Sequence, residues 1–229
     1  MIQIGSLHPE TIFLRQMIAI FNDLGFSVFE SPEADSEWYN FDAVNVPKDH
    51  PSRDVQDTFW LKDGRVLRTH TSNGQVRYGE MHKPPLKIVI PGRCYRNEAT
   101  DARHENTFTQ LEGLYIDKDV RVGHLFWTIR HFLKKMYGDS IEVRFRPHHY
   151  PFVEPGMDID IKYQGQWLEV LGSGMVHPKV MDNMRVDSGQ YSGFAFGLGV
   201  TRLVMLKYGI GDIRQFNSGD LRFLRQFHP

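Results

Sequence analysis

Two short stretches of the sequence carry charged and hydrogen-bonding side chains at the spacing of β-strands. The first contains Arg96 and Glu98, and the second contains Phe108, Gln110 and Glu112. Because residues two apart in a strand point to the same face, a hairpin of these stretches would gather them on one patch. Burying so many polar groups is costly unless they bind something polar. These residues alone leave two interpretations open, a surface ladder of cross-strand ion pairs or a site for a polar ligand.

A glycine-rich segment, Gly193–Gly199, invites comparison with a nucleotide-binding loop. It has neither the GxGxxG spacing nor a Walker lysine, and no strand–helix–strand unit surrounds it. Its glycines are instead expected to let the backbone lie close to a ligand or to a neighbouring strand.

Hydrophobic periodicity indicates the elements that must position these groups. Apolar residues recur at helical spacing in three segments, each followed by a glycine: Pro9–Leu24, Arg121–Tyr137 and Thr201–Tyr208. Strand candidates are Leu86–Ile90, Phe108–Ile116, Ile141–Arg146, Met157–Tyr163, Trp167–Leu171 and Gly193–Gly199. Strands outnumber helices and do not alternate with them, which predicts an α+β fold with an antiparallel sheet flanked by helices. Without repeats or linkers, residues 1–229 are expected to form a single domain.

Composition excludes several classes of protein. With 229 residues, 41% of them hydrophobic, the chain can bury a substantial core. No apolar run approaches the roughly 18 residues that span a bilayer, and the first residues lack a signal-peptide pattern. The only cysteine, Cys94, cannot form an internal disulfide, so a cytoplasmic location is expected and the thiol is interpreted as packing. One cysteine without an HExxH motif makes a structural zinc site improbable.

Charge is balanced overall but uneven along the chain. The net charge is −1, so the chain exerts little overall attraction on a nucleic acid. Acidic residues concentrate in 30–57 and basic residues in 201–229. These segments are either solvated faces of opposite sign or, for the basic one, a surface that faces a polyanion.

The motifs resemble signatures of the class II aminoacyl-tRNA synthetases. An arginine two residues before a glutamate, followed by a loop and an aromatic residue, resembles the second signature; Gly197–Arg202, with the pattern Gly-x-Gly-x-x-Arg, resembles the third. From about His8 to Phe227 the chain resembles the catalytic alpha subunits of bacterial-type phenylalanyl-tRNA synthetase. Supporting stretches are Asn40–Asn45, His50–Arg53, Asp57–Phe59, Thr69–Ser72, Phe152–Pro155, Gly174–Pro178 and Asp220–Leu224.

This resemblance implies a class II synthetase sheet and ATP-dependent activation of phenylalanine, followed by transfer of the acyl group to tRNA(Phe). The first step needs no general base, because the attacking carboxylate is already charged; it needs alignment and neutralisation of the α-phosphate. The resemblance implies that Arg96 grips that phosphate and that Arg202 clamps ATP from the other side. His104 would contact the phosphates, Phe108 would stack on adenine and Glu98 would bind the adenine amino group.

The resemblance also implies a phenylalanine pocket. The implied residues are His70, Ser72, Gln110 and Glu112 around the ammonium, Tyr150 and Phe152 against the ring, and Ala195 as the floor below its para position. The alternatives are a satisfied core histidine at position 70 and ordinary core aromatics at positions 150 and 152. Magnesium is expected with ATP, with Glu154 as its ligand by resemblance and Glu169 as a weaker candidate.

The implied partners are tRNA(Phe) and a beta subunit in an α₂β₂ tetramer, with no membrane. The first class II signature builds a subunit interface and corresponds to the segment 30–57. Its apolar residues are expected to be buried against a partner: Trp38, Tyr39, Phe41, Val44 and Val46.

The sequence departs from the family pattern in three respects. Family members usually carry an N-terminal coiled-coil arm, whereas this sequence starts at the catalytic domain. Position 201 is threonine where an acid is usual, which removes an orienting partner from Arg202, and Tyr150 replaces phenylalanine, with Asn73-Gly74 in place of a proline-containing pair. The alternatives are a paralogue that activates or binds an amino acid without charging tRNA, and a structural or regulatory module built on an inactive synthetase fold.

Overall fold

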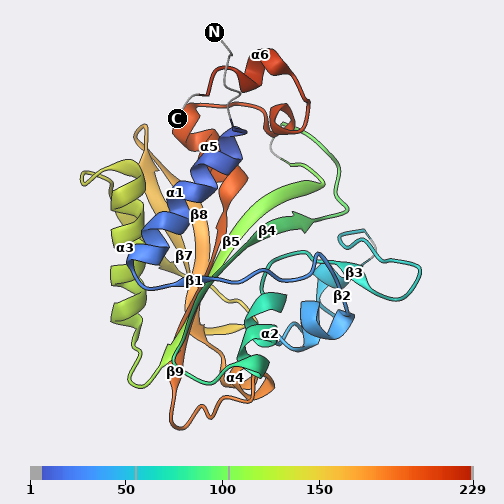
Figure 1. The fold of residues 1–229 in the computed structure, drawn as a ribbon, viewed down its shortest axis with the longest axis vertical. Helices are drawn as coiled ribbons and strands as arrows, with labels where there is room; N and C mark the ends of the chain where they lie inside the picture. Colours follow the sequence, from blue (N-terminus) through green and yellow to red (C-terminus); the bar gives the residue numbers. More distant parts are fainter. Residues whose placement is uncertain (1–6, 55, 103, 228–229) are drawn as a thin grey trace.

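A seven-stranded sheet forms the centre of the computed structural model, which describes residues 7–54, 56–102 and 104–227 (Figure 1). In spatial order the strands are β1 (Ser27–Val28), β4 (Leu86–Tyr95), β5 (Thr107–Asp117), β9 (Ser192–Gly199), β8 (Gln166–Val176), β7 (Val153–Tyr163) and β6 (Val143–Pro147). All neighbours pair antiparallel except β1 and β4, which are parallel. The predicted α+β class with a largely antiparallel sheet is therefore confirmed.

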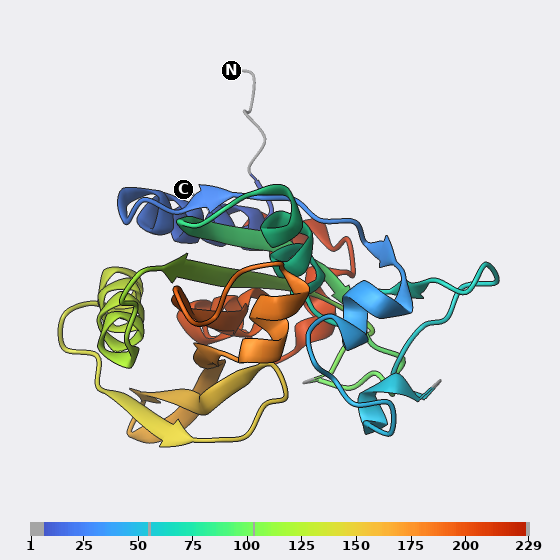
Figure 2. The same ribbon diagram turned by 90° about the horizontal axis from the view of Figure 1, so that it is seen from below.

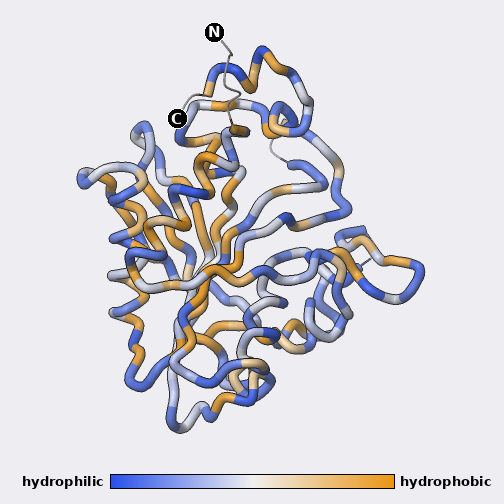
Figure 3. The backbone as a smooth tube through the Cα atoms, in the orientation of Figure 1, coloured by the Kyte–Doolittle hydropathy of each residue, from blue (hydrophilic) through white to orange (hydrophobic). Residues whose placement is uncertain are grey.

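The alternation of side chains along the strands creates two different faces. On β5, Leu111 belongs to one hydrophobic core, whereas Leu114 and Ile116 belong to another on the opposite face. The first core lies beneath α1 (Pro9–Asp23), α3 (Val122–Tyr137) and α5 (Val200–Tyr208); the second lies beneath α2 (Asn73–Met81) and α4 (Pro178–Asn183). The hydrophobic residues accordingly concentrate where the helices meet the sheet (Figure 3).

The three predicted helices are present, each with bounds within one residue of those expected. All six predicted strands form as well, but β4, β7 and β8 are longer than predicted. The sequence reasoning missed α2, because its two glycines, Gly74 and Gly79, lower its helix propensity. Gly79 is required by packing, since a Cβ there would lie 2.6 Å from Met184 Cβ. Also missed were α4, β1 and further short elements: β2 (Ala34–Asp35), β3 (Val66–Leu67), α6 (Leu221–Leu224) and the helical turns Trp38–Asp42, Pro51–Arg53 and Ile213–Phe216.

The segment 34–67 stands out on one side of the sheet (Figure 2). Three of its apolar residues are not available to a partner as predicted. Phe41, Val44 and Val46 are buried in the second core of the chain itself. Arg53 holds the turn closed through ion pairs with Glu37 at 2.9 Å and Asp42 at 3.0 Å. The expectation of burial against a partner is therefore wrong for these three residues; Trp38, with 48% of its surface exposed, remains free to meet one.

None of the helices among the described residues combines the length and the apolar character that a bilayer crossing demands.

Candidate active site

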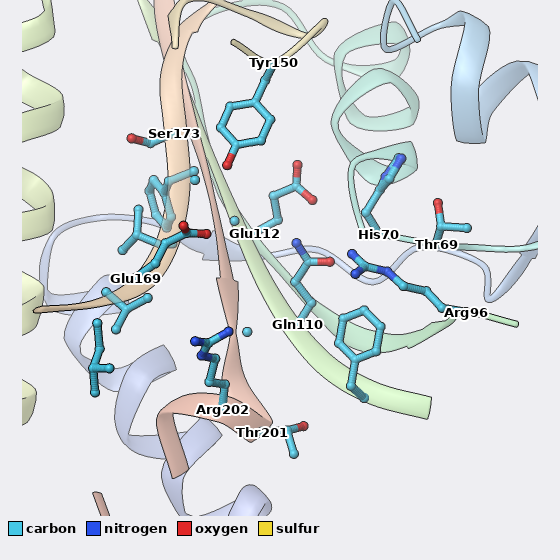
Figure 4. Close-up of a pocket in the computed structure, with 18 of the residues that line it drawn as sticks. Thr69, His70, Arg96, Gln110, Glu112, Tyr150, Glu169, Ser173, Thr201 and Arg202 are labelled. Atoms are coloured by element: carbon cyan, nitrogen blue, oxygen red, sulfur yellow. The ribbon is translucent and has the colours of Figure 1, made fainter. Parts of the chain in front are cut away.

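A cavity of about 1380 Å³ opens where the β4–β5 hairpin, β8, β9 and the start of α5 meet. We refer to it as the main cavity. It is lined by twelve of the predicted site residues, namely His70, Ser72, Arg96, Glu98, His104, Phe108, Gln110, Glu112, Tyr150, Phe152, Ala195 and Arg202, together with Glu169. Residues from five separate regions of the chain thus converge on one space (Figure 4).

The strand register explains the convergence on the hairpin. Phe108 pairs with Cys94, Gln110 with Gly92, and Glu112 with Ile90, so these residues share the face that continues to Arg96. The guanidinium carbon of Arg96 lies 4.8 Å from the centre of the Phe108 ring. The described hairpin residues form no cross-strand ion pair, so the surface-ladder alternative is not what the structure shows.

Small residues on β9 leave the floor of the cavity open. Ala195, Gly197 and Gly199 point to the cavity face, whereas Phe194 and Phe196 point into the first core. A Cβ at Gly197 would lie 2.8 Å from the Gln110 side-chain nitrogen. The expectation that these glycines permit close approach to a neighbouring strand agrees with this geometry.

Glu112 is a nearly buried carboxylate at the inner end of the cavity. It accepts hydrogen bonds from the Thr71 hydroxyl at 3.1 Å, the Ser72 hydroxyl at 2.5 Å and the Gln75 side chain. Burial raises its pKa to about 7, against the lowering effect of these hydrogen bonds. Sequence reasoning missed Thr71 and Gln75, although both flank the predicted Ser72.

His70 has an unpaired ring nitrogen at the edge of the same cavity. Its Nδ1 atom is shielded from solvent and has no hydrogen-bond partner among the described residues. Removal from water, with the Arg96 charge nearby, lowers the pKa of the ring to about 4, so the imidazole is neutral at pH 7. The unpaired atom is compatible with a ligand role for His70, which stays a prediction.

Two stacked rings form the wall beyond Glu112. The centres of Tyr150 and Phe152 lie 5.5 Å apart with nearly parallel planes, and Phe152 faces His70. The Tyr150 hydroxyl donates to the buried Asp158 carboxylate at 2.7 Å and packs against Gly172, where a Cβ would lie 2.8 Å from it. Burial, reinforced by this carboxylate, raises the pKa of the phenol. Tyr150 stands where the family pattern has phenylalanine, and its additional hydroxyl is held by these contacts with β7 and β8.

Arg96 and Arg202 enter the main cavity from different elements, the first after β4 and the second in the first turn of α5 (Figure 4). Neither has an ion-pair partner among the described residues. By contrast, Arg53, Arg77 and Arg146 pair with acids elsewhere in the fold. Two uncompensated guanidinium groups in one cavity are suited to a phosphate-bearing ligand.

The predicted metal ligand does not lie with these groups. Glu154 lines a second cavity of about 640 Å³, which we call the small cavity, and its carboxylate is 3.6 Å from His177 Nε2. Glu169 does line the main cavity, 3.4 Å from Arg146. Within the described ranges, no cluster of three or more His, Cys, Asp or Glu side chains could hold a metal unaided. A role for Glu154 in metal binding stays a prediction and concerns the small cavity.

Other proteins share this fold. Two solved structures of pyrrolysyl-tRNA synthetase from Desulfitobacterium hafniense superpose with TM-scores of 0.71 and 0.69 at 20% identity, covering 92% and 90% of this chain and 73% and 69% of theirs. The family model "tRNA synthetases class II core domain (F)" matches residues 1–227, so the chain is a class II aminoacyl-tRNA synthetase core domain.

Similar sequences identify the branch of the class II synthetases to which the chain belongs. The chain is 49% identical to a phenylalanine–tRNA ligase alpha subunit of Dehalococcoides mccartyi over 98% of its own length and 70% of the relative. The corresponding subunit of Synechocystis is 49% identical, covering 97% and 67%, and that of Xylella fastidiosa 50%, covering 97% and 68%. The chain belongs to the phenylalanine–tRNA ligase alpha subunit family, which confirms the resemblance found in its motifs.

Replacement of Glu112 by glutamine should change how stability depends on pH. A folded-state pKa of about 7, above the ordinary 4.5, means that the contribution of this group to stability is full below about pH 4.5 and is lost as pH rises through 7. We expect the Glu112→Gln variant to gain stability relative to the parent between pH 5 and pH 7.5. Urea unfolding of both proteins at these two values measures the change.

The control for this prediction is Glu142→Gln, which alters an exposed acid paired with Lys162. A stability difference between the Glu112→Gln variant and the parent that stays constant across this pH range would show that the Glu112 pKa is not raised.

Proposed function

We propose that this chain is the catalytic alpha subunit of a phenylalanine–tRNA ligase, forming phenylalanyl-adenylate from ATP and phenylalanine and transferring the acyl group to tRNA(Phe). The observation that carries the proposal is the pair of guanidinium groups, Arg96 and Arg202, that face one cavity without ion-pair partners among the described residues. The same cavity contains a carboxylate for an ammonium group and stacked aromatic rings for an aryl side chain.

In the first step an oxygen of the phenylalanine carboxylate attacks the α-phosphorus of ATP, and the bond to pyrophosphate breaks. No proton has to be removed, so the protein contributes alignment and charge neutralisation. Arg96 would hold the α-phosphate and the substrate carboxylate, with its guanidinium kept in place over Phe108. Arg202 would hold the phosphates from the side of α5.

The adenine would lie against Phe108, with Glu98 accepting from its amino group and His104 reaching the phosphates. Glu98 and His104 border the main cavity, and His104 is 3.0 Å from Asp101, so the loop after β4 can present both. Phe108 can stack on adenine because every nucleobase offers a π-face to an aromatic ring.

Phenylalanine would bind at the inner end of the main cavity. Its ammonium would meet Glu112, Gln110, Ser72 and the unpaired nitrogen of His70, and its ring would contact Tyr150 and Phe152 above Ala195. Partial protonation of Glu112 at neutral pH fits this role, because an incoming cation stabilises the charged carboxylate.

Magnesium, when bound with ATP, would neutralise phosphate charge. The donor set of the main cavity fits a metal that takes one or two carboxylates and completes its shell with phosphates and water. Glu169 is the carboxylate of β8 that lines this cavity and would serve as the protein ligand.

The assembly we propose is a cytoplasmic α₂β₂ tetramer in which a beta subunit assists tRNA binding. Three points support it. The relatives are named alpha subunits, and Trp38 remains exposed. The net charge of −1 gives the chain no overall attraction for a polyanion, so a partner that helps to bind tRNA is expected. The relatives are also longer than this chain, which spans about 70% of the Dehalococcoides subunit.

Arg96→Ala and Arg202→Ala should each lower phenylalanine-dependent ATP–pyrophosphate exchange about a hundredfold, because a preorganised charge at such a site is worth on the order of 3 kcal/mol. Arg65→Ala, which removes an exposed arginine paired with Asp63, serves as the matched control. Near-parental exchange in either cavity variant would refute the role of that arginine, and exchange by the parent without tRNA charging would point to the paralogue.

Ala195→Gly should enlarge the space at the para position of the bound ring. We expect para-chlorophenylalanine to become a substrate in the exchange assay while phenylalanine is little affected. Ala43→Gly, at a buried alanine outside the main cavity, controls for general loosening of the protein. An unchanged substrate range in a folded Ala195→Gly variant would place the ring elsewhere.

The chain by itself should bind ATP and phenylalanine but charge tRNA poorly, and addition of a beta subunit should restore charging. Light scattering gives the mass of each preparation and an aminoacylation assay gives its rate. A monomer that charges tRNA at full rate without a partner would contradict the proposed assembly.

A further inference from the structure

A carboxylate from α1 reaches the contact between Thr109 of β5 and Thr201 of α5, which we call the joint. Neither signature motif contributes a carboxylate there. Glu10 lies in the first turn of α1 and is half-buried. One of its oxygens accepts a hydrogen bond from the Thr201 hydroxyl, and the other accepts from the Thr109 hydroxyl at 3.3 Å. The joint closes through the Thr109 backbone N–H, which donates to Thr201 Oγ1 at 3.0 Å.

Both threonines adjoin residues that face the main cavity. Thr109 lies between Phe108 and Gln110 but points to the opposite face of β5, as strand alternation requires. Thr201 is only 4% exposed and directly precedes Arg202 in the first turn of α5. Glu10 itself does not line the cavity. Thr201, which donates to Glu10, does line it, so Glu10 is one hydrogen bond away from the cavity.

The first turn of α5 is electrostatically incomplete by itself. It carries Arg202 and no acidic residue, and no side chain caps its N-terminus. The exposed N–H groups of a helix start favour a negative charge and oppose a positive one. Glu10, hydrogen-bonded to Thr201, brings a carboxylate to this turn from α1.

We propose that Glu10 is a positioning residue for Arg202, replacing from α1 the carboxylate that position 201 lacks. It fixes Thr201 against β5 and so sets the direction in which Arg202 enters the main cavity. The proposal rests on the proposed function for the identity of the ligand, ATP, but not for the existence of the joint.

The test compares ATP and phenylalanine binding by calorimetry, together with the KM for ATP in pyrophosphate exchange, on the chain isolated with any subunit that co-purifies. Glu10→Ala should raise the Kd and KM for ATP about tenfold, and the Kd for phenylalanine less than twofold. Glu10→Gln keeps a hydrogen-bond acceptor and should lie between parent and Glu10→Ala. Asp23→Ala removes an acid at the far end of the same helix and should change neither.

The decisive variant moves the carboxylate of the joint from position 10 to position 201. Thr201→Glu alone crowds a second carboxylate against Glu10 and should weaken ATP binding. The double variant Glu10→Ala with Thr201→Glu places a single carboxylate back at the joint and should return the ATP Kd to within about threefold of the parent. A merely structural role for Glu10 would not give this reversal, since each substitution would add its own damage.

The outcomes separate the two hypotheses. A parent that binds ATP without exchanging pyrophosphate refutes the proposed function, and Glu10 is then judged on the ATP Kd alone. Equal loss of ATP and phenylalanine affinity, an unchanged ATP Kd in Glu10→Ala, or a double variant worse than both single variants overturns the positioning role. A parent that binds no ATP overturns both.

Discussion

The pairing register of β4 with β5 is the constraint on which the rest of the site depends. Because Gln110 lies opposite Gly92 and Glu112 opposite Ile90, the cavity face of the hairpin is fixed residue by residue. A shift of one residue would turn Phe108, Gln110 and Glu112 into the first core and expose Leu111 in their place. Burial of Leu111 on one face and Leu114 on the other makes such a shift costly. Hydrophobic packing on both sides of the sheet thus determines where the polar groups point.

Charge compensation in the main cavity differs from that of the buried acids elsewhere in the fold. Buried or half-buried acids such as Asp35 and Asp160 have arginine partners at 2.6 Å, as low-dielectric surroundings require. In the main cavity the pairing is incomplete: neither Arg96 nor Arg202 has an ion-pair partner among the described residues, and Glu112 is held by neutral hydrogen-bond donors. A ligand that carries phosphate groups and an ammonium group would complete both sets. The charges of the main cavity are therefore complementary to those of such a ligand.

Two departures from the family pattern, at positions 150 and 201, have hydrogen-bond partners within the chain. The Tyr150 hydroxyl is satisfied by Asp158, which keeps an added polar atom from being left unpaired in an aromatic wall. The threonine at position 201 is satisfied by Glu10 and Thr109. In both cases the compensating group comes from a different element, β7 in one and α1 in the other.

The sequence by itself determined the elements with strong periodicity and the residues that occupy signature motifs. Alternation along β5 predicted that Phe108, Gln110 and Glu112 share a face, and apolar periodicity predicted the helix Thr201–Tyr208 directly after the strand candidate Gly193–Gly199. Both depend on local geometry, which is why they could be predicted.

Only the tertiary structure decided what those residues meet. The helix α2 forms because its glycines allow close packing, not because of its propensity, and it brings Gln75 to Glu112. The residues Phe41, Val44 and Val46 turned inward, where the sequence had indicated a partner, because a core was within reach of their own chain. Glu10 and Thr201 are 191 positions apart, and no local pattern links them. Contacts of this kind depend on how separate elements pack, and packing is a property of the whole chain.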